Sequence, residues 1–283
     1  MFCLCSFAAV LVFLGVCAGQ APSTTGTGRS HDLVVFSQRE LVHIDVTTGQ
    51  SNSYSLPGIF SINAVDYDDV DNRLFIMSAY SNIASSNVDG SNLTYLRDWT
   101  SNPKPHSDCL TVASDARLVF FAGTGRQVVR MSVNGDHETV LVNRRNRVRR
   151  MAVDQATRMV FWCEQELDNH LYKMGFDGGQ VAIHKDLHFF GPRPRAMDLV
   201  NNRMFTVEYD GIYAINMTQF DYTMILSGRR SDMNEDIVYD PRRQRVFYSF
   251  GNLQKVRMMT PTGDQNSPIG PNLGRGKKLL LLL

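Results

Sequence analysis

A short sequence phrase recurs along this chain at a nearly constant interval, and this periodicity restricts the folds that the chain can adopt. Each copy has an apolar run, a polar turn containing Arg, a second apolar run containing Phe, and a third run that ends in Asp-Gly or Asn-Gly. Asp-Gly and Asn-Gly are the strongest short hairpin signals. The Arg recurs at intervals of 41 to 45 residues, as Arg73, Arg117, Arg158, Arg203 and Arg245.

A period of roughly 40–45 residues with four short strands in each unit is typical of a β-propeller. Five full units begin near Ile62, Leu110, Arg150, Arg195 and Asp236. Residues 31–56 precede them and contain three strand-like runs, Leu33–Ser37, Leu41–Val46 and Ser53–Leu56. Three strands and five units make six blades with one strand missing. The sequence therefore predicts an all-β fold, a six-bladed propeller of four-stranded blades over residues 32–270.

The missing strand is the uncertain part of this prediction, because an open propeller leaves two unpaired edges. Residues 271–283 form a tail that ends in five Leu. The run Leu279–Leu283 could be the closing strand, since an innermost strand is buried on both faces. The alternative is a truncated or mis-assembled C-terminus. This alternative is favoured, because Leu is not β-branched and a run of Leu fixes no register.

The repeat resembles the YWTD repeats (class B repeats) of the low-density lipoprotein receptor family. Three segments resemble the family's Ala-Val-Asp element: Ala64-Val65-Asp66, Ala152-Val153-Asp154 and Ala196-Met197-Asp198. Phe stands in place of the first Tyr of the signature, and an acid keeps its fourth position at Glu164 and Glu208. The resemblance covers nearly all of residues 33–262. It implies a propeller closed by its C-terminal segment, with secreted ligands bound on one face.

The N-terminus indicates export. Residues 1–20 are predicted to be a signal peptide, because the apolar run Ala8–Val16 is followed by small residues, although a charged start is lacking. This run is too short to span a bilayer comfortably. Residues 21–31, rich in Ser, Thr and Gly, are predicted to be a flexible leader. The sequons at Asn92 and Asn216 fit a secreted glycoprotein.

Two cysteines remain outside the predicted signal peptide, Cys109 and Cys163. They fall at strand ends that share one face of a propeller, so a disulfide between them is one interpretation. Two buried free thiols are the other, and it is favoured because the register decides whether the Cα atoms come within reach.

Catalytic motifs are not visible. The sequence contains no nucleophilic triad, phosphate-binding loop or zinc-ligand spacing, so we predict no catalytic residue, cofactor or metal. Some six-bladed lactonases hold Ca²⁺ at the propeller axis, and Asn63, Glu235 and Asp236 near first-strand starts could form such a site. Such residues more often only hydrate the mouth of the tunnel. A calcium-dependent hydrolase is therefore kept as an alternative.

Basic residues are distributed unevenly, although the formal net charge is only +1. In a propeller, the connections between blades share a face with the turns between second and third strands, and Arg clusters occur in three successive connections. Arg binds carboxylates and sulfates in a bidentate manner. A solvated loop neutralised by nearby acids is the alternative interpretation. The candidate ligand-binding residues are Trp99, Arg144, Arg145, Arg147, Arg149, Arg150, Arg193, Arg195, Arg229 and Arg230.

These observations predict a secreted, extracellular binding module that docks a protein ligand or a sulfated glycan on one face, without catalysis. A nucleic-acid partner and a membrane span are not expected. Besides the calcium-dependent hydrolase, a fragment of a larger lipoprotein-receptor-like protein remains an alternative.

Overall fold

Residues 31–283 form one compact unit in a computed structural model of the chain. The structure describes residues 32–37, 40–56, 59, 62–78, 82–98, 109–164, 170–186, 196–207, 210–219, 221–228, 236–249, 255–273 and 277–281. No helix occurs in these ranges. The predicted signal peptide and leader lie outside them.

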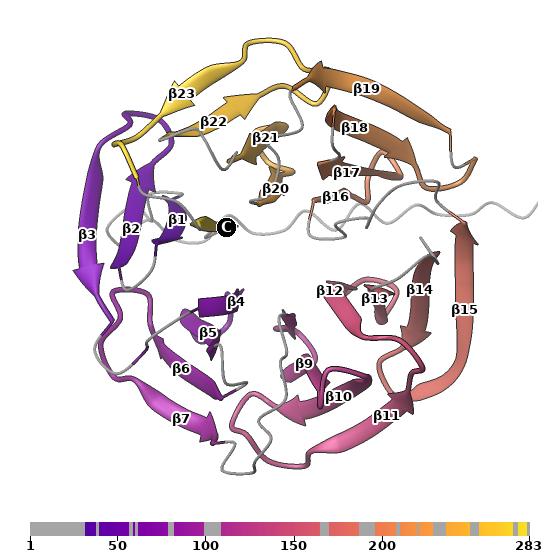
Figure 1. Cartoon of the computed structure of the whole chain (residues 1–283). Helices are drawn as coiled ribbons and strands as arrows, with labels where there is room; N and C mark the ends of the chain where they lie inside the picture. Colours follow the sequence, from indigo (N-terminus) through magenta and orange to yellow (C-terminus); the bar gives the residue numbers. More distant parts are fainter. Residues whose placement is uncertain are drawn as a thin grey trace, which may run out of the picture. The chain divides into compact units, whose positions relative to one another are not determined.

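The described strands form six antiparallel sheets of four strands, which we call blades 1 to 6 in chain order. Figure 1 shows them around a common axis, with the first strand of each blade near the centre and the fourth at the rim. The all-β, six-bladed prediction is therefore confirmed.

Blade 1 contains β24 (Lys277–Leu281), β1 (Asp32–Ser37), β2 (Glu40–Asp45) and β3 (Ser51–Ser55). Blade 2 contains β4 (Ile62–Asp68), β5 (Arg73–Ser78), β6 (Ile83–Asn87) and β7 (Thr94–Arg97), and blade 3 contains β8 (Leu110–Ala113), β9 (Leu118–Gly123), β10 (Gln127–Ser132) and β11 (Thr139–Asn143). Blade 4 contains β12 (Val148–Asp154), β13 (Met159–Glu164), β14 (His170–Gly175) and β15 (Gly178–Asp186). Blade 5 contains β16 (Met197–Asp198), β17 (Arg203–Val207), β18 (Gly211–Asn216) and β19 (Tyr222–Ser227), and blade 6 contains β20 (Ile237–Asp240), β21 (Arg245–Tyr248), β22 (Val256–Met259) and β23 (Ser267–Ile269).

The strand missing from blade 1 comes from the Leu-rich tail. Strand β24 pairs antiparallel with β1, and Leu279 lies opposite Val35. Leu279 is fully buried in an apolar cluster with Val35, Phe247 and Val256. The tail therefore supplies the fourth strand of blade 1, as in the interpretation in which Leu279–Leu283 closes the ring. The register of β24 against β1 is set by long-range contacts, which a run of identical side chains in the sequence cannot reveal.

Most of the core lies between neighbouring blades rather than within one. Trp162 and Phe120 belong to one cluster that joins blades 3 and 4, while Phe161 packs with Met204 of blade 5. Side chains on a strand alternate between the two faces of its sheet, so successive residues of β13 serve different neighbours. Burying one large apolar side chain contributes about 1.5–3 kcal/mol. Aromatic residues in the second strands thus hold adjacent blades together.

The repeated Arg of the sequence does not occupy one structural position. Arg117 and Arg158 are the last residues of the turns between first and second strands, where φ is 58° and 54°. Arg73, Arg203 and Arg245 come one position later and begin the second strand. In these three blades the left-handed turn position belongs instead to Asn72, Asn202 and Gln244.

The match of Ala64-Val65-Asp66 to the other Ala-Val-Asp elements is also wrong in register. Asp68, not Asp66, is the residue of blade 2 that corresponds to Asp154 and Asp198, because each of these lies opposite the first residue of the second strand. Asp240 holds the same place in blade 6. The sequence pattern alone does not reveal this register, because blade 2 has a second Asp, Asp66, two residues before the structurally equivalent one.

These four Asp residues cap the turns that follow them. The Asp198 carboxylate accepts hydrogen bonds from the backbone N–H of Asn201 at 3.3 Å and from Arg203 Nε at 2.7 Å. Burial alone would raise the pKa of Asp198, but the hydrogen bonds from Asn201 and Arg203 outweigh it and lower the pKa. At a pH above the unfolded-state pKa of Asp198, the ionised carboxylate therefore stabilises the fold. That stabilisation is lost as the pH falls through the lowered folded-state pKa.

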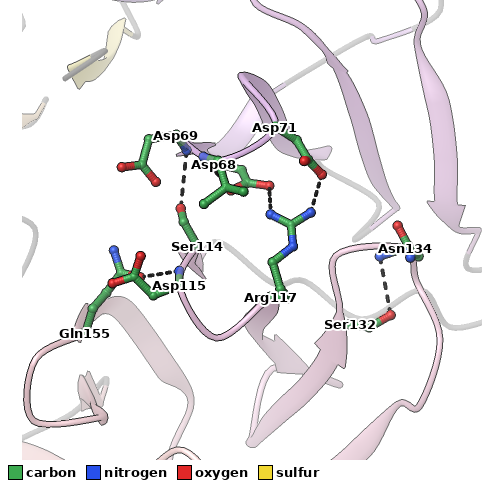
Figure 2. Close-up of polar contacts among 10 residues, drawn as sticks. Asp68, Asp69, Asp71, Ser114, Asp115, Arg117, Ser132, Asn134 and Gln155 are labelled. Atoms are coloured by element: carbon green, nitrogen blue, oxygen red, sulfur yellow. Dashed lines mark hydrogen bonds and ion pairs between the residues drawn. The ribbon is translucent and has the colours of Figure 1, made fainter. Parts of the chain in front are cut away.

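Polar contacts between these turns join neighbouring blades. Figure 2 shows Arg117 of blade 3 between Asp68 and Asp71 of blade 2. The contact from Arg117 Nη1 to the buried Asp68 carboxylate is 2.7 Å. Burial alone would lower the pKa of Arg117, but its hydrogen bonds with Asp68 and Asp71 raise it. The same figure shows Asp69 with Ser114 and Asp115 with Gln155.

Candidate docking face

The antiparallel strand order divides the connections of the ring between two faces. The turns between second and third strands and the crossovers between blades lie on one face, which we call the arginine face. The turns between first and second strands and between third and fourth strands lie on the other, which we call the sequon face. Backbone hydrogen bonds within the faces agree with this division. Arg144 N–H donates to Arg126 on the arginine face, and Met217 N–H donates to Asn202 on the sequon face.

The crossover from β11 to β12 and the start of β12 carry the densest group of Arg residues, at positions 144, 145 and 147 in the crossover and 149 and 150 in β12. It is fixed to the turn between β9 and β10 by two backbone hydrogen bonds. Arg144 N–H donates to the carbonyl of Arg126 at 2.7 Å, and Val148 N–H donates to the carbonyl of Gly125 at 2.7 Å. The crossover is therefore held in place by the neighbouring turn.

Arg144 is anchored into the ring. Its Nε donates to the carboxylate of Glu164, which is 6% exposed and also accepts a hydrogen bond from Trp162 Nε1 at 3.2 Å. The Arg144 guanidinium lies 4.5 Å from the centre of the Tyr172 ring, which in turn stacks with Trp162. One buried carboxylate thus neutralises Arg144 and orders the base of the crossover. In the sequence, Glu164 is recognisable only as the acid at the fourth position of the signature.

Two arginines remain exposed beside this anchor, Arg126 and Arg145. Within the described part of the chain, neither takes part in an ion pair or a side-chain hydrogen bond. The other three predicted residues of this segment, Arg147 in the crossover and Arg149 and Arg150 in β12, are half-buried. Arg150 stands in the irregular register between Arg149 and Met151, with a φ of 45°. The crossover therefore presents a smaller cationic surface than its composition suggests.

The other predicted ligand-binding residues lie outside the described residues. These are Trp99, Arg193, Arg195, Arg229 and Arg230. Whether they extend the surface formed by Arg126 and Arg145 stays a prediction.

Cys109 and Cys163 are both buried and are not bonded to each other as a disulfide. Cys109 belongs to the cluster between blades 3 and 4, on the same side of β13 as Trp162. Cys163 follows Trp162 directly, so its side chain lies on the opposite side of that sheet. The Cys163 thiol donates to the Arg149 carbonyl at 3.2 Å, and the Cys109 thiol donates to the Val148 carbonyl at 3.7 Å. A sheet separates the two thiols, which is why they are not bonded.

Among the candidate calcium ligands, Asp236 already has hydrogen-bonding partners. The Asp236 carboxylate accepts hydrogen bonds from the backbone N–H groups of Leu279 and Ile237, each at 3.1 Å, and so serves the closing strand. Asn63 is half-buried at the start of β4, and Glu235 lies outside the described residues. Across the described ranges, no three His, Cys, Asp or Glu side chains are grouped to hold a metal ion.

The two sequon asparagines both lie on the sequon face. Asn92 is exposed in the connection between β6 and β7, and Asn216 is exposed at the end of β18. Both positions are open to solvent, as a modified Asn requires.

Comparison with known proteins supports the fold. Neither a protein-family model nor a curated protein sequence matches this chain. A chain in the crystal structure of a nidogen/laminin complex superposes with a TM-score of 0.74 at 13% identity, covering 89% of this chain and 98% of that one. TolB from Acinetobacter baumannii superposes with a TM-score of 0.67 at 12% identity, covering 89% of this chain and 66% of that one. At such identities, these similarities show the fold alone.

Proposed function

We propose that this chain is a secreted, non-catalytic binding module of the YWTD type, which docks an acidic segment of a partner protein on its arginine face. The observation that carries the proposal is the pair Arg126 and Arg145, which are exposed and free of ion pairs among the described residues. Arg126 lies in the turn between β9 and β10 and Arg145 in the crossover, and backbone hydrogen bonds join the two segments. A fixed cationic surface loses less conformational freedom on binding than a mobile one. Arg also matches the geometry of a carboxylate.

A protein is favoured over a sulfated glycan as the partner, because one structural neighbour comes from a complex of two proteins. No helix in the described part of the chain has the length and hydropathy needed to cross a membrane. Secretion is supported by the apolar N-terminal run and the two sequons.

A matched pair of substitutions tests the docking surface. Arg145 lies on the arginine face and Arg242 on the sequon face, and both are exposed. Replacing Arg145 with Ala should weaken binding to an immobilised oligoglutamate peptide by about 2- to 5-fold, corresponding to about 0.5–1 kcal/mol for one exposed charge. The effect should fade as salt screens the interaction. Arg242→Ala should leave binding nearly unchanged.

The readout is biolayer interferometry from about 0.05 to 0.5 M salt, a range over which the screening length falls severalfold. Equal losses in the two variants would mean that only net charge matters, and the docking surface would be rejected. Immobilised heparin of similar charge is measured in parallel. Binding to heparin but not to the peptide would reject the acidic protein segment in favour of a sulfated glycan.

A further inference from the structure

We infer that Asn92 and Asn216 carry N-linked glycans, and that these glycans close the sequon face to protein partners, leaving the arginine face for docking. The chain contains two sequons, Asn92-Leu93-Thr94 and Asn216-Met217-Thr218. N-glycosylation needs an accessible Asn in an exposed connection of an exported chain. The inference thus rests on the secretion part of the proposed function.

Both sequons fall in the same kind of connection. Asn92 lies between the third and fourth strands of blade 2, and Asn216 between the third and fourth strands of blade 5. These connections share the sequon face. Blades 2 and 5 stand opposite each other in a ring of six, as Figure 1 shows. Two bulky glycans there would flank the sequon face from both sides.

The local geometry at Asn216 leaves its amide nitrogen available. The side-chain oxygen of Asn216 accepts hydrogen bonds from the backbone N–H groups of Thr218 at 2.8 Å and Gln219 at 3.1 Å. These bonds fix the side chain through its oxygen. In the described structure the Nδ2 atom, to which a glycan is attached, forms no hydrogen bond.

Two exposed apolar side chains lie in the segments next to Asn216 and give a second reason to expect a glycan there. Val200 is 88% exposed and Tyr222 is 52% exposed. The turn that contains Val200 is joined to the sequon by a hydrogen bond from Met217 N–H to the Asn202 carbonyl at 2.8 Å. Tyr222 begins the strand that follows the sequon turn. A glycan on Asn216 would shield exposed apolar side chains in the segments beside it.

The test is translation of the full chain with microsomes, followed by protease protection and digestion with peptide-N-glycosidase F. The protected chain should show two glycans as two steps in gel mobility. Asn92→Gln and Asn216→Gln should each remove one step. Thr94→Ser and Thr218→Ser should retain both steps, because Ser also completes a sequon. The control Asn201→Gln, an exposed Asn outside any sequon, should also retain both.

Two results would overturn the inference: a protected chain without glycans, or a chain that stays outside the microsomes. Neither result bears on the docking surface of the arginine face, which the peptide-binding measurement tests separately. If Arg145→Ala weakens peptide binding as predicted while the chain carries no glycan, the docking surface is retained and the glycan shield is rejected.

Discussion

Replacing Leu279 with Asp is expected to open the ring and to cost more than about 4 kcal/mol, a large share of the stability of an ordinary domain. Leu279 is fully buried in the apolar cluster of β24, β1 and blade 6. A carboxylate there would lose its hydration without gaining a partner. It would also lie near the Asp236 carboxylate, which accepts the Leu279 backbone N–H at 3.1 Å.

Chemical denaturation followed by tryptophan fluorescence measures this loss, and hydrogen exchange locates it. The amides of β1 should lose protection first, because β24 covers one edge of that strand. The control Leu279→Met keeps the apolar volume and should cost less than about 1.5 kcal/mol. If Leu279→Asp were as stable as Leu279→Met, β24 would not be the closing strand.

Replacing Glu164 with Ala should have the second largest effect, about 3–5 kcal/mol, because it leaves the buried Trp162 and the half-buried Arg144 without their carboxylate. The Arg144 guanidinium and Trp162 Nε1 both donate to Glu164 Oε1. The control is Glu138→Ala, which removes a bidentate ion pair to Arg97 at 2.7 and 2.9 Å. The Glu138 side chain is 39% exposed, so this substitution should cost about 1 kcal/mol or less.

Free energies of unfolding from urea titrations test this difference. The double variant Arg144→Ala, Glu164→Ala removes both charges. It should cost less than the sum of the two single substitutions, with a coupling of at least about 1 kcal/mol. Purely additive losses would show that Glu164 does not hold the crossover through Arg144.

The fold could be predicted largely from the sequence, because propeller blades are local units. Strands that pair within a blade follow one another in the chain, so their apolar runs and the turns at Gly90, Gly135 and Gly178 encode most of the topology. The closing strand is different, because β24 pairs with the strand at the other end of the ring. No local pattern in a run of Leu specifies that pairing.

The candidate site could be predicted only in part. The sequence indicated which face carries the crossover, since strand order decides it. It could not indicate that Arg144 is neutralised, because its partner Glu164 lies 20 residues later and is brought close by the pairing of β12 with β13. A count of charges treats the arginines of the crossover alike, whereas burial divides them into anchored, half-buried and exposed groups.

A glycan placed on the arginine face tests the docking proposal most directly. Arg145→Thr creates a sequon at Asn143, which is exposed beside the crossover. The variant Arg145→Thr, Asn143→Gln has the same loss of charge without a glycan. Both are secreted from insect cells and titrated against the oligoglutamate peptide. We expect the unglycosylated variant to show the modest loss of one Arg and the glycosylated variant to bind at least about tenfold more weakly than that, a difference of about 1.4 kcal/mol. Equal binding by the two variants, with the glycan verified by mass spectrometry, would show that the partner does not dock on the arginine face.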